Sequence, residues 1–275
     1  MAHYEAERME LATRDAVSKA ICREIQAGRG IEGGVYLDLT PIPAKLFQFR
    51  FPDLLQLFRN HGVDLQKQWI PVAPAAHFFM GGVVIDKGCQ TSIHGLFAAG
   101  EATGGVQGAN RLSGNGLSEP LVFGRIAGRE AARYAEKQRK IAAPREIFSF
   151  DWIGEEEIRE ERISEDRRKI KKWMGEKVGI IRHGAGLTQA LKELENEQEL
   201  FARGQPSSGA SLSSYFEVRS MLTAAMAVTR SAIFRQESRG AHFREDFPAS
   251  NPEMAKSTYL KLDQGRMRLS FSHGS

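Results

Sequence analysis

The most informative stretch of the chain is Gly95-Leu-Phe-Ala-Ala-Gly-Glu101-Ala-Thr-Gly-Gly-Val-Gln-Gly-Ala-Asn-Arg111-Leu-Ser-Gly-Asn-Gly-Leu117. Its beginning, residues 96–99, is a short apolar run that ends in Gly-Glu, as is typical of a buried parallel strand at its carboxyl end. A glycine-dense loop follows and carries Glu101, Asn110 and Arg111. The stretch therefore predicts a strand and then a loop whose backbone a ligand can approach closely.

A helix is predicted directly after this loop, over residues 118–132. Pro120 is expected in its first turn, where backbone N–H groups lack helical partners. A stripe of small residues predicts that the helix lies close against a sheet; its members are Gly124, Ala127, Gly128 and Ala131. Because a helix N-terminus offers free N–H groups and a positive dipole end, the whole unit is suited to an anionic ligand.

Two charged side chains of the loop have matching chemistry. Glu101 can accept hydrogen bonds from ribose or ribitol hydroxyls, and Arg111 can bind a phosphate or carboxylate through two parallel bonds. An ordinary glycine-rich turn with a solvated Glu101 and Arg111 explains the same spacing, since such turns are common between strands and helices. Spacing alone leaves both interpretations open.

The same loop resembles a known family. Gly100-Glu101, residues 108–112 (Gly-Ala-Asn-Arg-Leu) and Asn115 resemble the flavin-proximal segment of succinate dehydrogenase and fumarate reductase flavoproteins, a family that includes L-aspartate oxidase. Three further segments agree in the family's order: Glu10-Leu-Ala-Thr-Arg-Asp15, Ala76-His-Phe-Phe-Met-Gly-Gly82 and residues 235–248. The resemblance covers nearly the whole chain, but only the carboxyl-terminal half of the family's usual length.

The resemblance implies an α/β flavin-domain remnant with a partial α+β capping domain and a C-terminal helical domain. The expected divisions are a partial capping domain over 1–74, the C-terminal part of the FAD-binding domain over 75–140, and a helical domain over 141–275. The amino-terminal half of the FAD domain is expected to be missing, so the chain is interpreted as a truncated reading frame or one piece of a split gene.

A glycine pattern near the amino terminus is rejected as the missing nucleotide site. Residues 28–33 match Gly-x-Gly-x-x-Gly, but that fingerprint must follow a strand and open a helix. Here it follows a helix predicted over 10–26, with Thr13 as its N-cap and Gly28 as its stop, and it precedes a strand predicted over 35–39. A flexible turn is the better interpretation, so the sequence contains no pyrophosphate cradle.

Arg14 lies in the first turn of that predicted helix. It can be a plain surface charge, although an arginine at a helix N-terminus is unfavourable without a special partner. The resemblance implies instead that Arg14 is catalytic and moves a proton to or from the substrate carbon. Because arginine is a poor acid, relay through a neighbouring Asp or Glu is part of this hypothesis.

His77 begins the second motif. A lone histidine among apolar residues is usually a core or turn residue. The resemblance implies that His77 binds a substrate carboxylate and that Phe78 touches the flavin, while Arg111 is implied to bind both substrate and cofactor. Met80, where aspartate oxidases are associated with cysteine, favours the fumarate/succinate branch.

FAD is the implied cofactor. The resemblance places its contacts at Phe78, Glu101, Arg111, Leu112, Ser113, Gly114, Asn115, Gly116 and Leu117. Two positions depart from the family: Gln107 replaces a histidine, and Gly116 replaces the usual serine or alanine and removes a hydroxyl contact to the flavin. The implied reaction interconverts fumarate and succinate by hydride transfer at flavin N5, with an arginine proton shuttle.

Two other functions stay open at this point. The chain can be half of an L-aspartate oxidase, which would form iminoaspartate. It can also be a non-catalytic binding or scaffold subunit that keeps the fold without flavin. Flavin binding distinguishes this last function from the other two.

The remaining segments are predicted from pattern. A short helix over 52–61, extended backbone over 69–72 and a strand over 83–86 precede the glycine loop. A polar linker over 138–150, with Pro144, leads to charged helices over 155–174 and 187–197, a loop over 204–214 and an amphipathic helix over 216–234. Residues 237–242 resemble the family's terminal motif, which is implied to brace the flavin domain and face an iron–sulfur partner, with Arg239, His242 and Arg244 structural.

Composition excludes several classes. The 275 residues carry a formal charge of +4 with both signs interleaved, and no basic stripe predicts nucleic-acid binding. Cys22 and Cys89 lack metal spacing, so no metal site is predicted. No apolar run could span a bilayer and no signal core is present, so we expect a cytoplasmic protein with membrane association only through partner subunits. The expected partners are a dicarboxylate substrate, an iron–sulfur electron-transfer subunit and the missing FAD-domain half.

Overall fold

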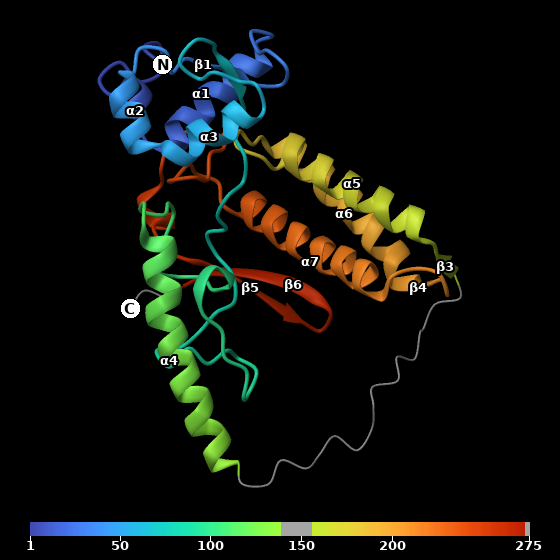
Figure 1. Cartoon of the computed structure of the whole chain (residues 1–275). Helices are drawn as coiled ribbons and strands as arrows, with labels where there is room; N and C mark the ends of the chain where they lie inside the picture. The colour runs from blue at the N-terminus through green and yellow to red at the C-terminus, as the bar shows by residue number, and fades with distance from the viewer. Residues whose placement is uncertain (139–155, 273–275) are drawn as a thin grey trace. The chain divides into compact units, whose positions relative to one another are not determined.

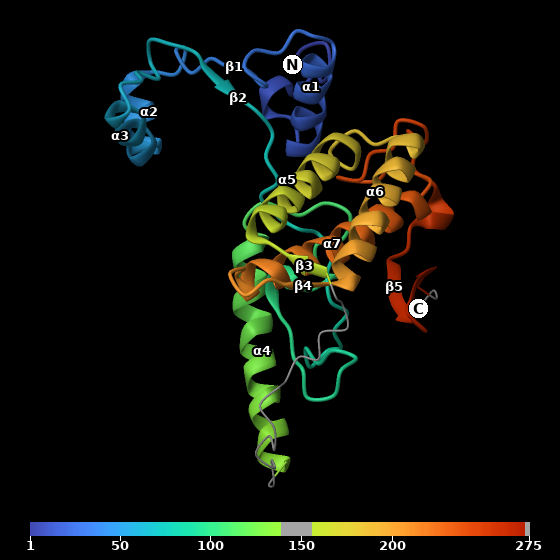
Figure 2. The ribbon, with the colours of Figure 1, turned by 90° about the vertical axis from the view of Figure 1, so that its right-hand side faces the viewer.

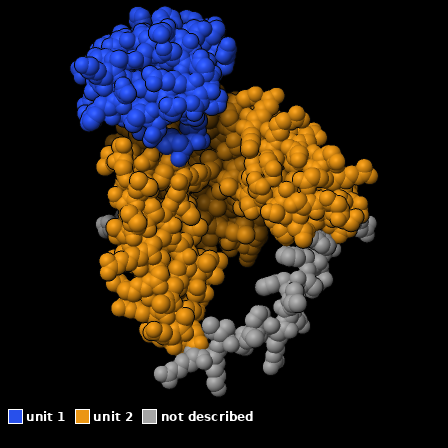
Figure 3. Space-filling view, in the orientation of Figure 1, with its two compact units in different colours: residues 1–77 blue, residues 78–275 orange. Residues whose placement is uncertain are grey.

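The computed structural model describes residues 1–138 and 156–272. These residues form two compact units, Met1–His77 and Phe78–Ser275, each described below by itself (Figure 3). The linker predicted over residues 138–150, including Pro144, falls beyond the described residues except at its first position.

The first unit contains short helices around one antiparallel strand pair. Its elements are η1 (Met9–Leu11), α1 (Arg14–Gln26), β1 (Val35–Leu37), α2 (Ala44–Arg50), α3 (Pro52–Asn60) and β2 (Ile70–Val72). Val35 lies opposite Val72 in the β1–β2 pair. Phe47, Leu55 and Leu65 are buried together and form the small core of this unit.

The amino-terminal helix starts later than the predicted range 10–26. Residues 9–11 form the separate 3-10 turn η1, and Thr13 is the extended N-cap residue of α1, as predicted. Gly28 follows α1 with φ +74°, and Ile31 then pairs with Gly34. The Gly28–Gly33 segment is therefore a turn, as predicted, and not a nucleotide loop.

Helix α2 was not predicted. Its apolar residues Leu46 and Phe49 share one helix face but are exposed, and only Phe47 is buried, so the helix has no buried apolar stripe. Helix α3, in contrast, confirms the short helix predicted from residue 52, and β2 confirms the extended backbone at 69–72.

In the second unit, the buried parallel strand predicted at residues 96–99 is wrong. Phe97 forms an isolated antiparallel bridge with Gln90, and Leu96 is 48% exposed. The amide of Thr91 donates to Leu96 O at 2.9 Å, and that of Ala98 donates to Cys89 O at 3.0 Å. Because only residues 92–95 separate the paired segments, the chain can close a hairpin but not the long crossover that a parallel pair needs.

The strand predicted at residues 83–86 is reduced to one bridge, between Val83 and Thr103. Glu101 lies in a single 3-10 turn, η2 (Gly100–Ala102). Figure 1 shows this region as loops that run alongside α4 (Asn115–Lys137). The glycine loop is therefore supported by α4 rather than by a sheet of described strands.

Helix α4 begins three residues before its predicted start, after Gly114 with φ +86°. Pro120 consequently lies inside the helix, in its second turn, which corrects the prediction of a first-turn proline. A proline there removes one helical hydrogen bond. Gly100 lies against its ring: a Cβ added at Gly100 would stand 3.1 Å from Pro120 Cβ.

The small-residue stripe of α4 does not lie against a sheet within the described residues, contrary to prediction. A Cβ added at Gly124 or Gly128 would meet no atom within 4 Å outside the helix's own backbone. Contacts come instead from the 89–97 hairpin: Cys89 Sγ donates to Phe123 O at 3.5 Å, and the His94 ring lies 5.1 Å from the Tyr134 ring.

Three helices form the main core of the second unit. Helices α5 (Glu160–Lys177), α6 (Gly184–Arg203) and α7 (Leu212–Phe234) lie side by side in Figures 1 and 2 and confirm the predicted helices. The buried residues between them are Ile158, Ile163, Ile170, Leu194, Phe201, Tyr215, Val218, Leu222, Ala225 and Met226. The amphipathic pattern of residues 216–234 predicted a helix in a bundle core, as α7 is, whereas residues 155–174 and 187–197 were predicted only as charged helices.

Strands complete the second unit and were not predicted. β3 (Glu156–Ile158) lies in the range predicted as a helix, and the helix α5 starts only after it, at Glu160. β3 pairs in parallel with β4 (Gly204–Pro206), which lies inside the range expected to be a loop. After η3 (Pro252–Met254), β5 (Thr258–Asp263) and β6 (Arg266–Phe271) form an antiparallel hairpin whose two-residue turn is Gln264-Gly265, both with positive φ. The C-terminal region is therefore not wholly helical.

Candidate functional site

Arg14 and His77 lie together in the first unit. Arg14 Nη1 is 3.4 Å from His77 Nε2, although the two residues are 63 positions apart. Helix α1 presents Arg14 in its first residue, and His77 ends the extended segment that follows β2. Because a guanidinium only donates hydrogen bonds, His77 Nε2 is the acceptor in this contact.

Asp15, beside Arg14 in sequence, is an ionised carboxylate. Burial raises its pKa, but hydrogen bonds from Thr13 and Lys19 outweigh burial and lower the pKa below its ordinary value. Lys19 Nζ lies 3.3 Å from Asp15 Oδ2. The carboxylate is thus held in the charged form next to the predicted proton shuttle.

Arg111, Phe78 and Gly116 come together in the second unit. The Arg111 guanidinium carbon lies 4.4 Å from the centre of the Phe78 ring, a cation–π arrangement. A Cβ added at Gly116 would stand 3.2 Å from both Arg111 Nη1 and Phe78 Cε2. The glycine at this position, a departure from the family pattern, therefore makes room for the Arg111–Phe78 stack.

The backbone of Arg111 is also held. Its amide donates to Met80 Sδ at 3.1 Å, so the loop is tied to the motif that follows His77. Glu101 makes a second tie, because its Oε1 accepts a hydrogen bond from the Phe79 amide at 2.7 Å. Glu101 is thus partly engaged by backbone, and its second oxygen is the one suited to a ligand hydroxyl.

Gly82, the second glycine after Met80, is required by a close approach of two backbone segments. A Cβ at Gly82 would lie 2.2 Å from Ala102 O, so only glycine allows the two backbone segments to cross at this distance. Val83 N donates to Ala102 O at 2.9 Å at the same crossing. The crossing fixes the segment of Glu101 relative to the segment of Phe78.

A buried polar chain below the loop was missed by sequence reasoning. Asn115 Nδ2 donates to Gln107 Oε1 at 3.2 Å, and Gln107 Nε2 donates to a carboxylate oxygen of Glu119. Glu119 is only 4% exposed. Gln107 uses both ends of its amide, so it orients the side chain of Asn115. A glutamate between the apolar residues Leu117 and Leu121, directly before Pro120, was the available signal.

The remaining predicted cofactor residues surround an open backbone. Leu112 and Leu117 are 78% and 77% exposed, and Gly114 has φ +86° with no atom within 4 Å of an added Cβ. Gly105 and Gly108 are equally open, both with positive φ. Bare glycine backbone and exposed leucines beside the N-terminus of α4 fit the flat ring and hydroxylated chain of a flavin.

Comparison with known proteins decides the family. A family model of the FAD binding domain matches residues 1–117, and one of the fumarate reductase flavoprotein C-term matches residues 167–273. L-aspartate oxidase of Rhodospirillum rubrum is 38% identical over 88% of this chain and 80% of that protein. The chain belongs to the fumarate reductase/succinate dehydrogenase flavoprotein family. The resemblance seen in the sequence is confirmed, and the domain match supports FAD as the family cofactor.

Other members of this flavoprotein family are longer than this chain. One subunit of the fumarate reductase (CoM/CoB) of Methanothermobacter marburgensis is 41% identical over 92% of this chain and 48% of its own length. A solved quinol-fumarate reductase superposes with a TM-score of 0.79 at 32% identity, covering 97% of this chain and 50% of that one. The Sdh1 complex of Mycobacterium smegmatis gives 0.73 at 32% identity, covering 95% and 47%. The chain thus spans about half the length of these flavoproteins.

Several predictions stay predictions after these comparisons. They concern the roles of the individual site residues and the domain limits at 74 and 140. In the two described ranges, no cluster of three or more His, Cys, Asp or Glu side chains could hold a metal ion. Among the helices that the structure describes, none is long and apolar enough to cross a membrane.

Proposed function

We propose that this chain carries the dicarboxylate-handling half of an FAD-dependent oxidoreductase that interconverts fumarate and succinate. The observation that supports this most is the 3.4 Å approach of Arg14 Nη1 to His77 Nε2. These residues belong to two separate motifs, each implied to act on the substrate. Their meeting within one compact unit is what a shared substrate role requires.

The proposed substrate contacts divide by charge. A dicarboxylate presents two anionic groups, and we assign them to the His77 side chain and the Arg111 guanidinium. The stack on Phe78 restricts Arg111 to one direction, so its fork is oriented before substrate arrives. Arg14 is assigned the proton that is exchanged with the carbon next to the one taking the hydride, and the ionised Asp15 is its candidate relay.

FAD, when bound, supplies hydride transfer at its N5 atom. The residues proposed to hold it are Phe78, Glu101, Arg111, Leu112, Ser113, Gly114, Asn115, Gly116 and Leu117. Within this set, Glu101 offers a free carboxylate oxygen to a hydroxyl, and the glycines let the cofactor approach backbone N–H groups at the N-terminus of α4. Gln107 keeps Asn115 in place from below.

The proposal includes the partners expected from the sequence. A polypeptide with the amino-terminal FAD-domain half would provide the pyrophosphate cradle, and an iron–sulfur subunit would exchange electrons with the flavin. A cytoplasmic location, with any membrane attachment made by partner subunits, belongs to the same proposal. The exposed apolar residues Leu117, Leu121 and Val122 of α4 are available to such a complement.

An L-aspartate oxidase function is the second candidate. It is favoured by the 38% identity to the Rhodospirillum rubrum enzyme over 80% of that protein. Met80 favours the fumarate/succinate branch instead, as argued from the sequence. A flavin-free scaffold is the third candidate. A scaffold would not need the open glycines or the Arg111–Phe78 stack, so these features favour the enzymatic functions.

The test is a substrate comparison on the chain co-expressed with an amino-terminal FAD-domain half from a relative. We expect retained flavin absorbance and fumarate-dependent oxidation of a reduced dye. Formation of iminoaspartate from L-aspartate, without dye oxidation by fumarate, would establish the aspartate oxidase function. A complex that retains no flavin would contradict both enzymatic functions and support the scaffold.

A further inference from the structure

We infer that Gly240 is a positioning residue for Arg111: the terminal motif, defined here as residues 235–251, clamps the loop segment 109–111 and sets the place of its arginine. The clamp is inferred from contacts within the structure alone. Its consequence for substrate rests on the function proposed above for Arg111.

The clamp is a close backbone contact. The amide of Ala241 donates to Ala109 O at 2.9 Å. A Cβ added at Gly240 would lie 2.3 Å from Ala109 O, 2.6 Å from its carbonyl carbon and 3.0 Å from its Cβ. Any side chain at position 240 must therefore push one backbone segment away from the other. Gly240 also has φ +57°, so glycine suits this position on two grounds.

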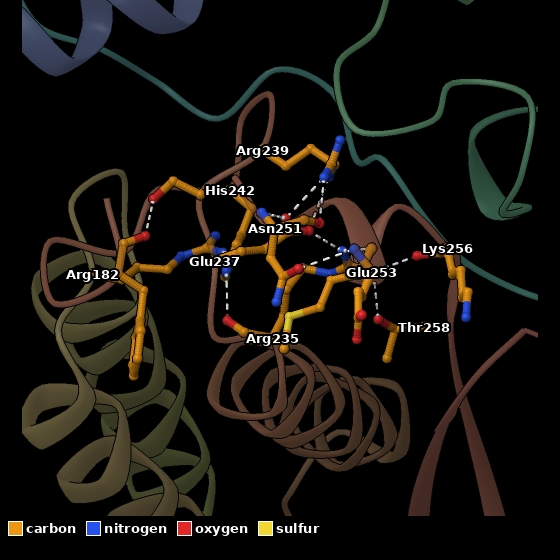
Figure 4. A network of polar contacts seen from close by, with 12 residues as sticks. Arg182, Arg235, Glu237, Arg239, His242, Asn251, Glu253, Lys256 and Thr258 are labelled. Carbon is orange, nitrogen blue, oxygen red and sulfur yellow. Dashed lines mark hydrogen bonds and ion pairs between the residues drawn. The ribbon is translucent and has the colours of Figure 1, made fainter. Parts of the chain in front are cut away.

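The motif that carries Gly240 is firmly held. Glu237 is 0% exposed and pairs with both Arg235 and Arg239, and its Oε2 accepts from the Asn251 amide at 2.7 Å (Figure 4). Arg239 Nη2 also donates to Asn251 O at 2.9 Å. Burial raises the pKa of Glu237, but these donors outweigh it and hold the pKa at about 2. The Gly240 turn is thus fixed at its base by a closed charged network.

The same motif is attached to the helical core. Arg244 is buried, pairs with Asp246 at 2.7 Å and donates to Ala232 O of α7 at 2.8 Å. Asp246 in turn accepts from the Gly184 amide, the first residue of α6, at 3.0 Å. Arg182 Nη1 contacts His242 Nδ1 at 2.7 Å (Figure 4). The rigid helices can therefore transmit their position to Gly240.

Segment 109–111 is held at both ends by different motifs. The terminal motif binds Ala109 O, and Met80 Sδ accepts the Arg111 amide at 3.1 Å. The guanidinium then reaches the Phe78 ring. Arg111 lies only two residues after Ala109, so a displacement of Ala109 also displaces the backbone of Arg111. A displacement of about 1 Å at a substrate-binding group is enough to reduce turnover by up to about a hundredfold.

The experiment compares two glycine substitutions that differ in one respect. Gly240→Ala adds a Cβ at a positive φ and into the Ala109 carbonyl. Gly265→Ala, in the β5–β6 turn, adds a Cβ at φ +76° with nothing within 4 Å. The unsubstituted chain and both variants are studied by hydrogen exchange with mass spectrometry, read at the amides of Ala241 and Arg111. Arg239→Gln, which loosens the network from a partly exposed side chain, serves if Gly240→Ala does not fold.

We expect exchange at both amides to be about tenfold faster in Gly240→Ala, or in Arg239→Gln, than in Gly265→Ala. Equal exchange in the Gly240 and Gly265 variants would overturn the clamp. In the flavoprotein completed with its FAD-domain half, we expect the KM for the dicarboxylate to rise about tenfold or more with flavin absorbance kept. If the unsubstituted flavoprotein turns over no dicarboxylate, the proposed function fails, while the exchange result still decides the clamp.

Discussion

Helices α4 and α7 have the same length, 23 residues each, but opposite packing. Helix α7 buries Tyr215, Val218, Leu222, Ala225, Met226, Thr229 and Ala232. Helix α4 buries only Glu119 and Ala127, and leaves Leu121 75% exposed. Both sequences carry apolar residues along their length, so the presence of apolar residues alone does not distinguish a completed core from a face that needs a complement.

Two parts of the second unit therefore differ in what they do. The helices around α7 contain their own apolar core and support the terminal motif. Helix α4 and the glycine loop present open glycine backbone and exposed leucines, which fits the proposal that a FAD-domain half covers them. We expect substitutions near α7 to change stability, and those on α4 to change assembly and flavin retention.

The largest effect on stability is expected at the end of α7, in the terminal motif. Glu237→Ala leaves Arg235 and Arg239 without their buried carboxylate, so the free energy of unfolding should fall by about 3–5 kcal/mol. Because the pKa of Glu237 is about 2 in the fold and 4.5 in its ordinary state, its contribution is present above pH 4.5 and is lost as pH falls towards 2. Urea unfolding at several pH values measures both. A loss of less than about 1 kcal/mol in the free energy of unfolding would contradict the role of the Glu237 network in holding the terminal motif.

A matched pair of leucines tests the comparison directly. Leu222→Ala on α7 removes a side chain that is 1% exposed, so we expect a loss of about 2–5 kcal/mol. Leu121→Ala on α4 removes an exposed one and should change stability by no more than about 0.5 kcal/mol. Thermal melts followed by circular dichroism give both values. Similar losses at the two positions would break the contrast between the helices.

A pH effect should come from His242. Burial, and then the charge of Arg182, lower its pKa to about 4 in the fold. The unfolded chain, with an ordinary pKa of 6.5, binds more protons between these values, so stability should decline as pH falls from 6.5 to 4. His242→Gln should flatten this part of the stability profile, and the same unfolding measurements reveal it. An unchanged slope in the variant would show that other groups cause the decline.

The smallest change in stability is expected for a substitution on α4. Gly124→Ala should stabilise the isolated chain by about 0.5–1 kcal/mol, because an added Cβ meets no atom there. Gly175→Ala on α5 is the control, since its Cβ also enters open space. Only the Gly124 variant should weaken binding to a FAD-domain half, measured by co-purification. Equal co-purification of the two variants would remove the small-residue stripe from the proposed contact.

The fold was predictable where the pattern is long and local. The amphipathic pattern of α7 predicted its place in a helical core, the charged patterns predicted α5 and α6 as helices, and Thr13 predicted the start of α1. Residues 96–99 were mispredicted because a run of four apolar residues does not reveal which segment pairs with it. The β5–β6 hairpin was missed although Gln264-Gly265 adopts a common hairpin turn.

The motifs of the candidate site could be predicted from the sequence, but the distances between their side chains could not. Arg14, His77 and Arg111 came from the family resemblance, whereas the 3.4 Å approach of Arg14 to His77 required the structure. Glu119 and Gly240 escaped prediction because their importance comes from contacts that no sequence pattern reveals, with Gln107 and Ala109 respectively. From the sequence, Gly116 was interpreted as the loss of a hydroxyl contact to the flavin. In the structure, the absence of a side chain at Gly116 makes room for the Arg111–Phe78 stack.

The most direct test of the proposed function is the rate of fumarate-dependent dye oxidation by the completed flavoprotein, compared among the unsubstituted protein, Arg14→Ala and Arg29→Ala. Arg29 is an arginine of the same unit, paired with Glu24 at 2.6 Å, and serves as the control. We predict that Arg14→Ala lowers the rate at least about a hundredfold with full flavin absorbance, and that Arg29→Ala leaves it near the unsubstituted value. A near-normal rate in Arg14→Ala would contradict the proton-shuttle role.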